Sequence, residues 1–413
     1  MERLAVWFQG VRAGTIEYDE ATNSFTFSYD AEYLADSRAV RMSASLPLRP
    51  EPFDPYVSRK YFENLLPPEI VRRKLEIVLH ISAGNVFGAL KALGRDCAGA
   101  VSIYPDGEAP DEAGAERLLV LTEEEAEKAI RSLPQRPLLV GKYDGFRMSA
   151  AGAQDKVIAR VCDGALVLPL YGAASTDIVK PSAQRLSESV FNEFFCQRLA
   201  AACGLDAAKC DIVRFGSETC YRTVRFDRYE DAGRVRRWHQ EDFCQVLDLE
   251  PEQKYQDEGG PSIARCLRAI REERLGFAAQ RKFLDYVIFN YLIGNADAHG
   301  KNFSIVHRGG VADVAPLYDA MSTAVYEGAT THMAMRIGAA VSLADVSRTS
   351  FLELAAVCDI DGRFVAGELD RLCDVLPGEA AALAESLSDA GHDSPVYAKI
   401  VGCIDANVRR VLA

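Results

Sequence analysis

The segment NADAHGKNFSIV, residues 295 to 306, carries the side chains of this chain that are best suited to chemistry. Asp297 and Asn302 lie five residues apart in one short turn, and Asp319 follows 17 residues after Asn302. In phosphoryl transfer, one carboxylate orients the attacking hydroxyl and accepts its proton, while an amide oxygen and a second carboxylate hold Mg²⁺ on the phosphates of ATP. The spacing therefore predicts an ATP-dependent kinase.

Two apolar elements must position this turn. RKFLDYVIFNYLIG, residues 281 to 294, is apolar almost all round, which predicts a buried helix ending at the turn. FSIV after the turn resembles a strand, and VADVAPLYD leads to Asp319 as a second apolar run. A turn at Arg308-Gly309-Gly310 between the two strands would bring Asn302 and Asp319 to one metal ion.

Simpler explanations exist for the same residues. Asn and Asp side chains in a polar loop often bond only to their own backbone, and an Asp after a strand is often a helix N-cap. His299 has three open roles: contact with nucleotide, metal ligation, or a hydrogen bond to a backbone carbonyl. The placement of the turn between two core elements favours the chemical reading, because such loops are good platforms for catalysis.

A kinase also needs a cation near the ATP phosphates, and Lys180 in DIVKP is the candidate. A buried lysine needs a carboxylate partner to stay charged. The following helix offers Glu188 and Glu193, and the choice between them stays open. Without the other parts, Lys180 would be read as a surface residue at a strand end.

A segment rich in small residues, GFRMSAAGAQDKVIARV, begins at Gly145. Small side chains let backbone N–H groups approach phosphate oxygens closely. Gln154 and Lys156 could add polar contacts, and Ser149 is a hydroxyl that could accept phosphate. The segment matches neither common glycine-rich phosphate motif, so its signal is weak when taken alone.

The rest of the chain has clear local signals. Residues 1 to about 105 open with alternating stretches that predict antiparallel strands, and residues 61 to 80 look helical. The best linker candidate is residues 104 to 116. Further expectations are a capped helix at Thr122 with Glu125, a hairpin at Asp163-Gly164, a helix closed by Gly204, and one helix face that carries Arg265, Arg268, Arg271 and Arg274.

Composition narrows the class of protein. The 413 residues, 48% hydrophobic and 26% charged, are typical of a globular chain of two or three domains. No apolar run approaches a membrane span, no secretory leader is evident, and the eleven cysteines include no C-x-x-C pair, so a reducing cytoplasm is expected. A net charge of −13 argues against nucleic-acid binding by this chain alone.

With these parts assembled, the chain resembles the HipA family, the serine/threonine-kinase toxins of bacterial type II toxin–antitoxin modules. The first hundred residues resemble the family's N-terminal subdomain, with GAVSIYP as its tail. From residue 149 to about 322 the matching segments, in the family's order, are SAAGAQDK, DIVKP, NEFFCQRLAAACGL, VRFDRY, HQEDFCQVL, KYQDEGGPSIARC, NADAHGKNFS and PLYDAMS.

The resemblance implies an α+β, two-lobed protein-kinase-like fold with a β-rich N-terminal lobe, an extra N-terminal subdomain and a mostly helical C-terminal lobe. We expect the segments to be 1–110, 111–236 and 237–413. It implies Asp297 as catalytic base and Asn302 and Asp319 as Mg²⁺ ligands. The residues expected to contact ATP are Ala151, Gly152, Ala153, Gln154, Asp155, Lys156, Lys180, Val224, Arg225, Phe226, His299, Lys301, Asn302, Tyr318 and Asp319.

Regulation and partners also follow from the resemblance. Ser149 matches the family's autophosphorylated serine, whose dianionic phosphate would repel ATP from the phosphate loop. Val224 departs from the family, which often has Glu there, so that side-chain contact to adenine is in doubt. The expected partners are a small helix-turn-helix antitoxin resembling HipB, operator DNA bound through it, and an aminoacyl-tRNA synthetase as substrate, whose phosphorylation stalls translation and promotes persistence.

Two rival hypotheses remain. One is a catalytically weak, kinase-like corepressor that mainly binds the antitoxin, but such a scaffold would not need Asp297, Asn302 and Asp319 together. The other is a metal-dependent phosphohydrolase using Asp297, His299 and Asp319. The absence of further histidines at ligand spacing counts against the hydrolase.

Overall fold

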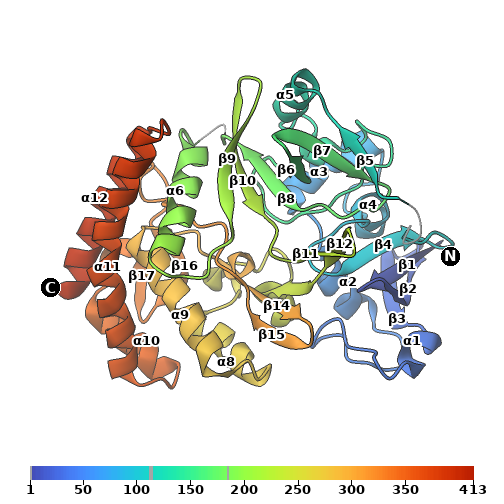
Figure 1. Ribbon diagram of the computed structural model, residues 1–413. Coiled ribbons are helices and arrows are strands. Elements are labelled where there is room, and N and C mark those ends of the chain that lie inside the picture. Colours follow the sequence, from blue (N-terminus) through green and yellow to red (C-terminus); the bar gives the residue numbers. More distant parts are fainter. Residues whose placement is uncertain (1, 111–114, 184–185) are drawn as a thin grey trace. The chain divides into compact units, whose positions relative to one another are not determined.

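The computed structural model describes residues 2–110, 115–183 and 186–413 (Figure 1). These residues form two compact units. The β-rich unit comprises Met1–Pro181, Val213–Glu252 and Val306–Val311. The helical unit comprises Ser182–Ile212, Gln253–Ile305 and Ala312–Ala413. The expected division at 110 and 236 cuts the chain into three continuous segments, whereas each observed unit is built from three stretches that are separate in sequence. The three-segment division therefore stays a prediction.

The β-rich unit begins with a four-stranded sheet in the order β3-β2-β1-β4. Buried and half-buried residues alternate along β3, as expected when one face of a strand packs on a core. The strands are β1 (Glu2–Phe8), β2 (Val11–Asp19), β3 (Ser24–Tyr29) and β4 (Val101–Pro105). Neighbouring strands pair antiparallel, which confirms the expectation for this region.

Four helices lie in the sequence between β3 and β4: α1 (Ala31–Ala35), α2 (Pro55–Glu63), α3 (Glu69–Leu79) and α4 (Val86–Leu93). The helical region expected from residue 61 to 80 is therefore interrupted, and the prediction of continuous helix was wrong. Pro67 and Pro68 account for the break, since proline lacks the N–H that an internal helical position donates.

The second sheet of this unit has six strands in the order β5-β7-β6-β8-β10-β9. They are β5 (Arg117–Val120), β6 (Val157–Cys162), β7 (Ala165–Leu170), β8 (Asp177–Pro181), β9 (Cys210–Phe215) and β10 (Glu218–Val224). The hairpin expected at Asp163-Gly164 is present, with both residues at positive φ. Helix α5 (Glu123–Arg131) begins with the expected capping box of Thr122 and Glu125. Of the linker candidate, residues 111–114 lie outside the described residues.

The unit is completed by β11 (Arg228–Asp231), β12 (Arg234–Arg237), β13 (His239–Asp242) and the short α7 (Phe243–Val246). Strand β13 belongs to a three-stranded sheet with β14 (Ser304–Arg308) and β15 (Val311–Val314). The boundary between the units runs through the hairpin of β14 and β15. Its turn lies at Gly309-Gly310, both at positive φ, where the sequence predicted it.

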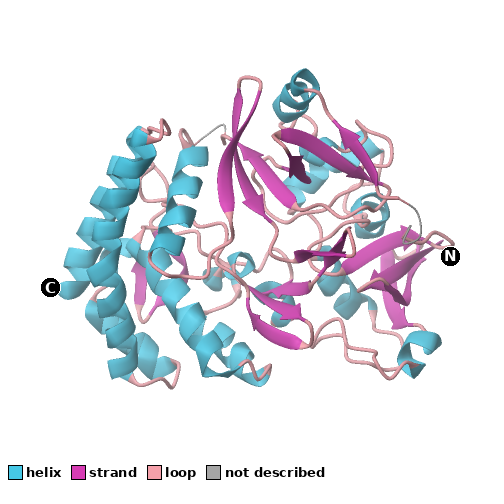
Figure 2. Cartoon of the chain, viewed as in Figure 1, coloured by secondary structure: helices cyan, strands magenta, loops and turns pink. Residues whose placement is uncertain are grey.

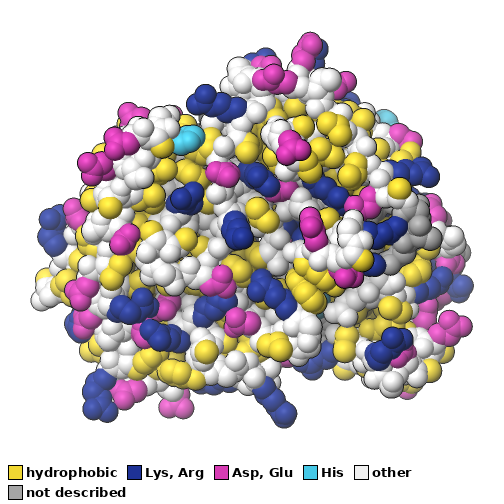
Figure 3. Space-filling model, in the orientation of Figure 1, with side chains coloured by type: hydrophobic (Ala, Val, Ile, Leu, Met, Phe, Trp, Pro, Cys, Tyr) yellow, Lys and Arg dark blue, Asp and Glu magenta, His cyan; other side chains and the backbone are white. Residues whose placement is uncertain are grey.

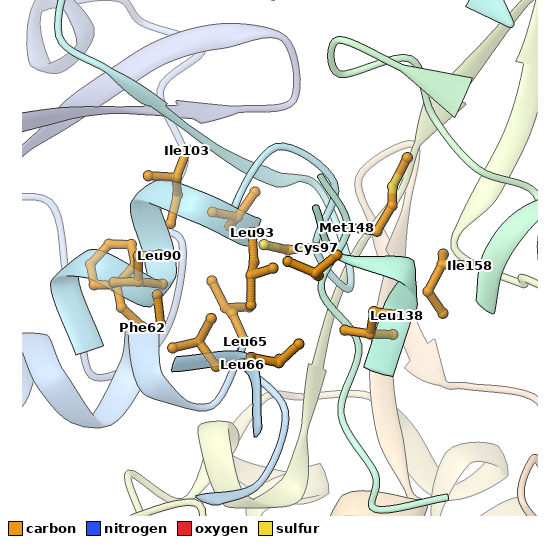
Figure 4. Close-up of a cluster of buried hydrophobic side chains, with 14 of the residues drawn as sticks. Phe62, Leu65, Leu66, Leu90, Leu93, Cys97, Ile103, Leu138, Met148 and Ile158 are labelled. Carbon is orange, nitrogen blue, oxygen red and sulfur yellow. The ribbon is translucent and has the colours of Figure 1, made fainter. Parts of the chain in front are cut away.

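A single buried apolar cluster joins the N-terminal sheet and its helices to the second sheet. Figure 4 shows Leu65 and Leu93 pointing toward the same interior as Leu138, Met148 and Ile158. Burial of apolar surface stabilises by about 25 cal/mol per Å², so this shared cluster explains why the N-terminal subdomain and the second sheet form one unit.

The helical unit is built from α6 (Ser189–Ala202), α8 (Ile263–Glu272), α9 (Gly276–Leu292), α10 (Arg348–Val357), α11 (Gly362–Asp389) and α12 (Pro395–Leu412) (Figure 2). A small ladder of β16 (His332–Ile337) and β17 (Ala340–Ser342) and the 3₁₀ turns η2 (Gln256–Glu258), η3 (Gly300–Asn302) and η4 (Leu343–Asp345) complete it. Helix α11 packs against α6, α9, α10 and α12.

Helix α9 is buried along most of its length, as its apolar sequence predicted. Helix α8 carries Arg265, Arg268 and Arg271, but it ends at Glu272, so Arg274 lies beyond the predicted helix face. Side chains of both charges are interspersed over the visible surface (Figure 3). Among the described residues, no helix is both long and apolar enough to cross a membrane.

Candidate active site

The polar turn, defined here as residues 295–302, follows directly after α9. Gly294, at positive φ, turns the chain out of the helix. Asn295 then bonds back to α9, donating from Nδ2 to Asn290 Oδ1 at 2.7 Å. Its own Oδ1 accepts from the backbone N of Asp297 at 3.0 Å, so the end of the buried helix fixes the backbone at Asp297.

The first residues of the polar turn are also anchored by segments distant in sequence. Ala296 N donates to Thr323 Oγ1 at 2.8 Å, and Ala296 O accepts from Ala334 N of β16 at 2.8 Å. Next to Thr323, Ser322 exchanges two 2.9 Å hydrogen bonds with the side chain of Asn192 in α6. The polar turn is therefore hydrogen-bonded to a helix, a strand and a loop. Such anchoring holds catalytic side chains in fixed positions.

The two expected metal ligands lie beside a pair of residues that contact each other. Tyr318 donates its hydroxyl to Lys301 O at 2.8 Å and shares a 2.7 Å hydrogen bond with Ser304 Oγ. Asn302 and Asp319 are the direct sequence neighbours of Lys301 and Tyr318. The hydrogen bonds of Tyr318 therefore connect the residue before Asp319 to the residue before Asn302. Metal binding shared by Asn302 and Asp319 stays a prediction.

The amide nitrogen and the amide oxygen of the Asn302 side chain have different roles. Its Nδ2 donates to the backbone oxygen of Asp297 at 3.1 Å, which orients the amide and leaves Oδ1 as the acceptor. Asp319 adopts a positive φ of 58°, which is uncommon for a residue other than glycine and typical of functional loops.

The negative charge of Asp319 affects the protonation of the Asp297 carboxyl. Protein atoms displace part of the water around the Asp297 carboxyl and raise its pKa, although the residue keeps an open face to solvent. Lys254 and Tyr255 act in the opposite direction, while the negative charge of Asp319 raises the pKa further. The charges of Asp297 and Asp319 thus interact, and a divalent cation near both carboxylates would be stabilised.

The donor set suits Mg²⁺ held jointly with a nucleotide. Asn302 Oδ1 and Asp319 supply hard oxygen ligands, and Mg²⁺ is commonly held by one or two such groups together with substrate phosphates. Within the described part of the chain, no cluster of three or more His, Cys, Asp or Glu side chains forms a metal site made by protein alone. The oxygen donors of Asn302 and Asp319 are of the kind that Mg²⁺ prefers.

His299 is buried, with 8% of its surface exposed. Its Nε2 accepts a hydrogen bond from Lys254 Nζ at 3.0 Å, and burial and the charge of Lys254 lower its pKa well below the usual range. The imidazole is consequently neutral. Nε2 thus contacts a lysine and not a backbone carbonyl. The role of His299 toward a nucleotide or a metal stays a prediction.

Lys254 and Tyr255 were missed by sequence reasoning. Tyr255 donates its hydroxyl to Asp297 Oδ1 at 2.9 Å, although the two residues are 42 positions apart. Both lie in KYQDEGGPSIARC, one of the segments that carry the family resemblance, and that match was the only signal that could have found them.

In the β-rich unit, the expected phosphate loop, Ala151 to Lys156, folds back on itself. Lys156 Nζ donates to Ala151 O at 2.6 Å and spans the loop. Gly152, at a φ of 95°, lies so close to that amine that a Cβ there would collide with it. The positive φ favours glycine at 152, and the loop holds the buried amine of Lys156 against one of its own carbonyls. Gln154 Nε2 donates to Pro181 O at 3.3 Å, which ties the loop to β8.

Lys180 is buried on β8, opposite Tyr221 of β10 in the antiparallel register. Its Nζ lies 5.6 Å from the centre of the Tyr221 ring. In the helical unit, Glu193 is buried in α6, and Glu188 accepts a hydrogen bond from Ser394 Oγ at 2.7 Å. The pairing of Lys180 with either glutamate stays a prediction.

Arg225, expected near adenine, uses its side chain for structure. Its guanidinium donates to Asp227 at 2.8 Å and to Cys97 O at 2.9 Å. It belongs to what we name the Asp96 cluster, a buried group consisting of Asp96, Ser175, Arg225, Asp227, Arg228 and Arg237. The Arg225 side chain is therefore engaged within the protein, and Phe226 O accepts from Arg308 at 3.3 Å.

Ser149 is fully buried beside Met148 of the apolar cluster. Its Oγ donates to Leu65 O at 2.5 Å, and its backbone N donates to Asp96 O at 3.0 Å. In this conformation the hydroxyl is closed to any phosphate donor.

The predicted site residues thus form two groups, each assembled within its own unit. The helical unit holds Asp297, His299, Lys301, Asn302, Tyr318 and Asp319. The β-rich unit holds Ser149, the phosphate loop, Lys180 and the Val224–Phe226 segment.

Comparison with known proteins defines the class. The chain is similar to HipA in the solved complex of the Shewanella oneidensis HipA–HipB toxin–antitoxin system with its operator DNA, with a TM-score of 0.84 and 26% identity over 99% of this chain and 97% of that one. This likeness confirms the expected α+β, two-lobed kinase-like fold.

Sequence comparison gives the family. Residues 4–104 match the HipA N-terminal domain, and residues 148–379 match the HipA-like C-terminal domain. The chain is 40% identical to Y4mE of Sinorhizobium fredii, named as a candidate kinase, over 95% of this chain and 94% of Y4mE. It is 31% identical to the serine/threonine-protein kinase toxin HipA of Shewanella oneidensis, over 78% of this chain and 76% of that protein. The chain belongs to the HipA family, which confirms the expected class of protein kinase.

Proposed function

We propose that this protein is an Mg·ATP-dependent serine/threonine kinase that acts as the toxin of a HipA-type toxin–antitoxin module. The polar turn carries the proposal, because Asn302 is hydrogen-bonded to Asp297 within it and the charge of Asp319 acts on the Asp297 carboxyl. A scaffold that only bound a partner would gain nothing from this set of two carboxylates and an amide.

Each residue has a chemical task in the proposed reaction. Asp297 accepts the proton of the attacking serine hydroxyl, and Asn302 Oδ1 and Asp319 hold the metal. Bound Mg²⁺ neutralises charge on the phosphates. In the β-rich unit, Lys156, Lys180 and the backbone around Gly152 bind phosphate oxygens, and the Val224–Phe226 backbone contacts adenine. His299, neutral and buried, lines the nucleotide together with Lys301 and Tyr318.

Ser149 is the proposed site of autophosphorylation. A dianionic phosphate cannot occupy the position of a buried hydroxyl that donates to Leu65 O, since burying an unpaired charge is very costly. Transfer to Ser149 therefore requires residues 148–156 to leave their packed position, and the modified residue cannot return. The phosphate loop would stay displaced, so phosphorylation would switch the enzyme off.

The proposed partners follow from the relatives. The similar HipA is found with HipB and operator DNA. We extend this assembly to the present chain: a small helix-turn-helix antitoxin binds it and supplies most of the DNA contacts, which suits a net charge of −13. The proposed substrate is an aminoacyl-tRNA synthetase in the cytoplasm, phosphorylated so that translation stalls and growth arrests.

Incubation of the purified protein with Mg²⁺ and γ-labelled ATP tests the function. Label on Ser149 in the wild-type protein, absent in both Asp297→Asn and Ser149→Ala, supports the kinase. Release of free phosphate without labelled protein would favour a hydrolase. Neither signal, with antitoxin binding retained, would favour the corepressor. The starting material is first treated with phosphatase so that prior modification of Ser149 does not mask activity.

A further inference from the structure

One segment that has no role in the proposed reaction contacts the polar turn through two side chains. We name residues 253–260 the clamp segment. Its backbone contacts the turn through Lys254 O, which accepts from Gly300 N at 3.1 Å. Its side chains contact the turn through Lys254 and Tyr255, which bond to His299 and Asp297, respectively.

The Tyr255 hydroxyl donates to one oxygen of the proposed base, Asp297 Oδ1, at 2.9 Å. Burial and the nearby charge of Asp297 raise the pKa of Tyr255, so the phenol keeps the proton that it donates. A carboxylate has two oxygens, and a fixed bond to Oδ1 sets the rotation of the group. Oδ2 is then the oxygen that accepts the proton of a substrate hydroxyl.

Lys254 fixes the neighbouring imidazole in the same way. Its Nζ donates to His299 Nε2 at 3.0 Å, which requires the ring to carry its hydrogen on Nδ1. The rings of Tyr255 and His299 meet edge to face at 5.4 Å between centroids, and Lys254 Nζ lies 4.8 Å from the Tyr255 ring centre. Lys254, Tyr255, Asp297 and His299 therefore restrain one another.

The clamp segment is itself fastened to regular structure. Arg336 of β16 donates its backbone N to Gln256 Oε1 at 2.8 Å and pairs with Asp257 at 2.5 Å. Arg265 of α8 donates to Gly260 O at 3.1 Å. A tyrosine held from both a strand and a helix can impose a position on Asp297, which a freely moving side chain could not.

We propose that Tyr255 is a positioning residue for phosphoryl transfer, which fixes Asp297 by hydrogen bonding to Oδ1, while Lys254 fixes the tautomer of His299. This inference rests on the proposed kinase function and adds two residues to it. It predicts that loss of the Tyr255 hydroxyl slows transfer without weakening nucleotide binding.

Tyr255→Phe isolates the effect, because phenylalanine keeps the ring contact with His299 and removes only the hydroxyl. The matched control is Tyr286→Phe in α9, which removes a 2.7 Å hydrogen bond to Asp206 O elsewhere in the same unit. For each protein we would measure the maximal rate of Ser149 labelling by γ-labelled Mg·ATP, the half-saturating ATP concentration, the Kd for Mg·ADP and Tm.

The expected result is a maximal rate at least about tenfold lower in Tyr255→Phe, with half-saturating ATP and the Kd for Mg·ADP within about twofold of wild type. Tyr286→Phe lowers Tm by a few degrees or less and keeps the wild-type rate. An unchanged rate in Tyr255→Phe overturns the inference, as does a loss that follows Tm in both variants, which would mean a purely structural tyrosine. A wild-type protein that binds Mg·ADP but labels nothing overturns the kinase function, and the role of Tyr255 falls with it.

Discussion

The Asp96 cluster in the β-rich unit and the polar turn in the helical unit are both built around aspartates held by hydrogen bonds. Asp96 is fully buried, and its oxygens accept from Arg228 and Arg237 at 2.9 Å each and from Ser175 at 2.6 Å. Asp297 keeps an open face, with its Oδ1 bonded to Tyr255.

Electrostatics separates the two regions further. Burial alone would raise the pKa of Asp96, but three arginines hold it well below its usual range. Around Asp297 the balance is reversed, and the pKa is raised. In this comparison, the carboxylate whose charge is balanced by buried arginines stabilises the fold, whereas the carboxylate with the raised pKa keeps a face open to solvent.

The largest expected effect is on the rate of phosphate transfer and comes from a substitution in the polar turn. Asp297→Asn should lower the rate of phosphate transfer by about a thousandfold, since general base catalysis contributes roughly 10² to 10⁴. Asn still accepts from Tyr255 and removes the repulsion with Asp319, so Tm should not fall. Labelling rate and thermal unfolding check this. Asp313→Asn, which alters a carboxylate of β15 in the hairpin that follows the polar turn, serves as the control and should keep its rate.

The second prediction breaks the Asp96 cluster. Asp96→Ala leaves three arginines without their shared carboxylate, and removing one partner of a buried ion pair costs about 3–5 kcal/mol. Urea unfolding should show this loss. Lys128→Ala, which breaks an exposed pair with Glu124, should leave the unfolding midpoint unchanged. Equal stability of Asp96→Ala and wild type would mean that the cluster is not structural.

The third prediction concerns pH and the β-rich unit. His239 is buried, and burial, together with His307, lowers its pKa to about 3. The unfolded state takes up a proton near pH 6.5 that the folded state refuses. This contribution to stability is full above pH 6.5 and is lost as pH falls, by about 2 kcal/mol at pH 5. The free energy of unfolding should fall less between pH 7 and pH 5 in His239→Gln than in wild type; equal losses would contradict the assignment.

The smallest expected effect is on ATP binding and comes from a substitution in the phosphate loop. Gly152→Ala places a methyl group against Lys156 Nζ and should weaken ATP binding by about tenfold, or about 1.4 kcal/mol. Gly164→Ala is the matched control, because it also has a positive φ but faces open space. Both substitutions should destabilise by about 1 kcal/mol, since a Cβ strains such a backbone. Only Gly152→Ala should change the Kd for ATP measured by calorimetry.

Local signals made much of the fold predictable. The hairpin at Asp163-Gly164, the cap at Thr122 and the turn at Gly309-Gly310 depend on residues within a few positions of one another. For that reason, the strand–turn–strand pattern between Asn302 and Asp319 could be inferred, while their joint binding of a metal stays a prediction.

The remaining features depend on partners distant in sequence. Tyr255 reaches Asp297 across 42 positions, and the side chain of Arg225 donates to Cys97 O across 128 positions. Neither contact has a periodic or local signature. The break before α3 and the end of α8 ahead of Arg274 show that apolar spacing predicts helices more reliably than their ends.

The central claim is that Asn302 and Asp319 hold one divalent ion together with a nucleotide. Calorimetric titration of ADP with and without Mg²⁺, in wild type and in Asp319→Ala, tests it most directly. We expect Mg²⁺ to tighten ADP binding in wild type and this gain to disappear in Asp319→Ala. An equal gain in both proteins would contradict it.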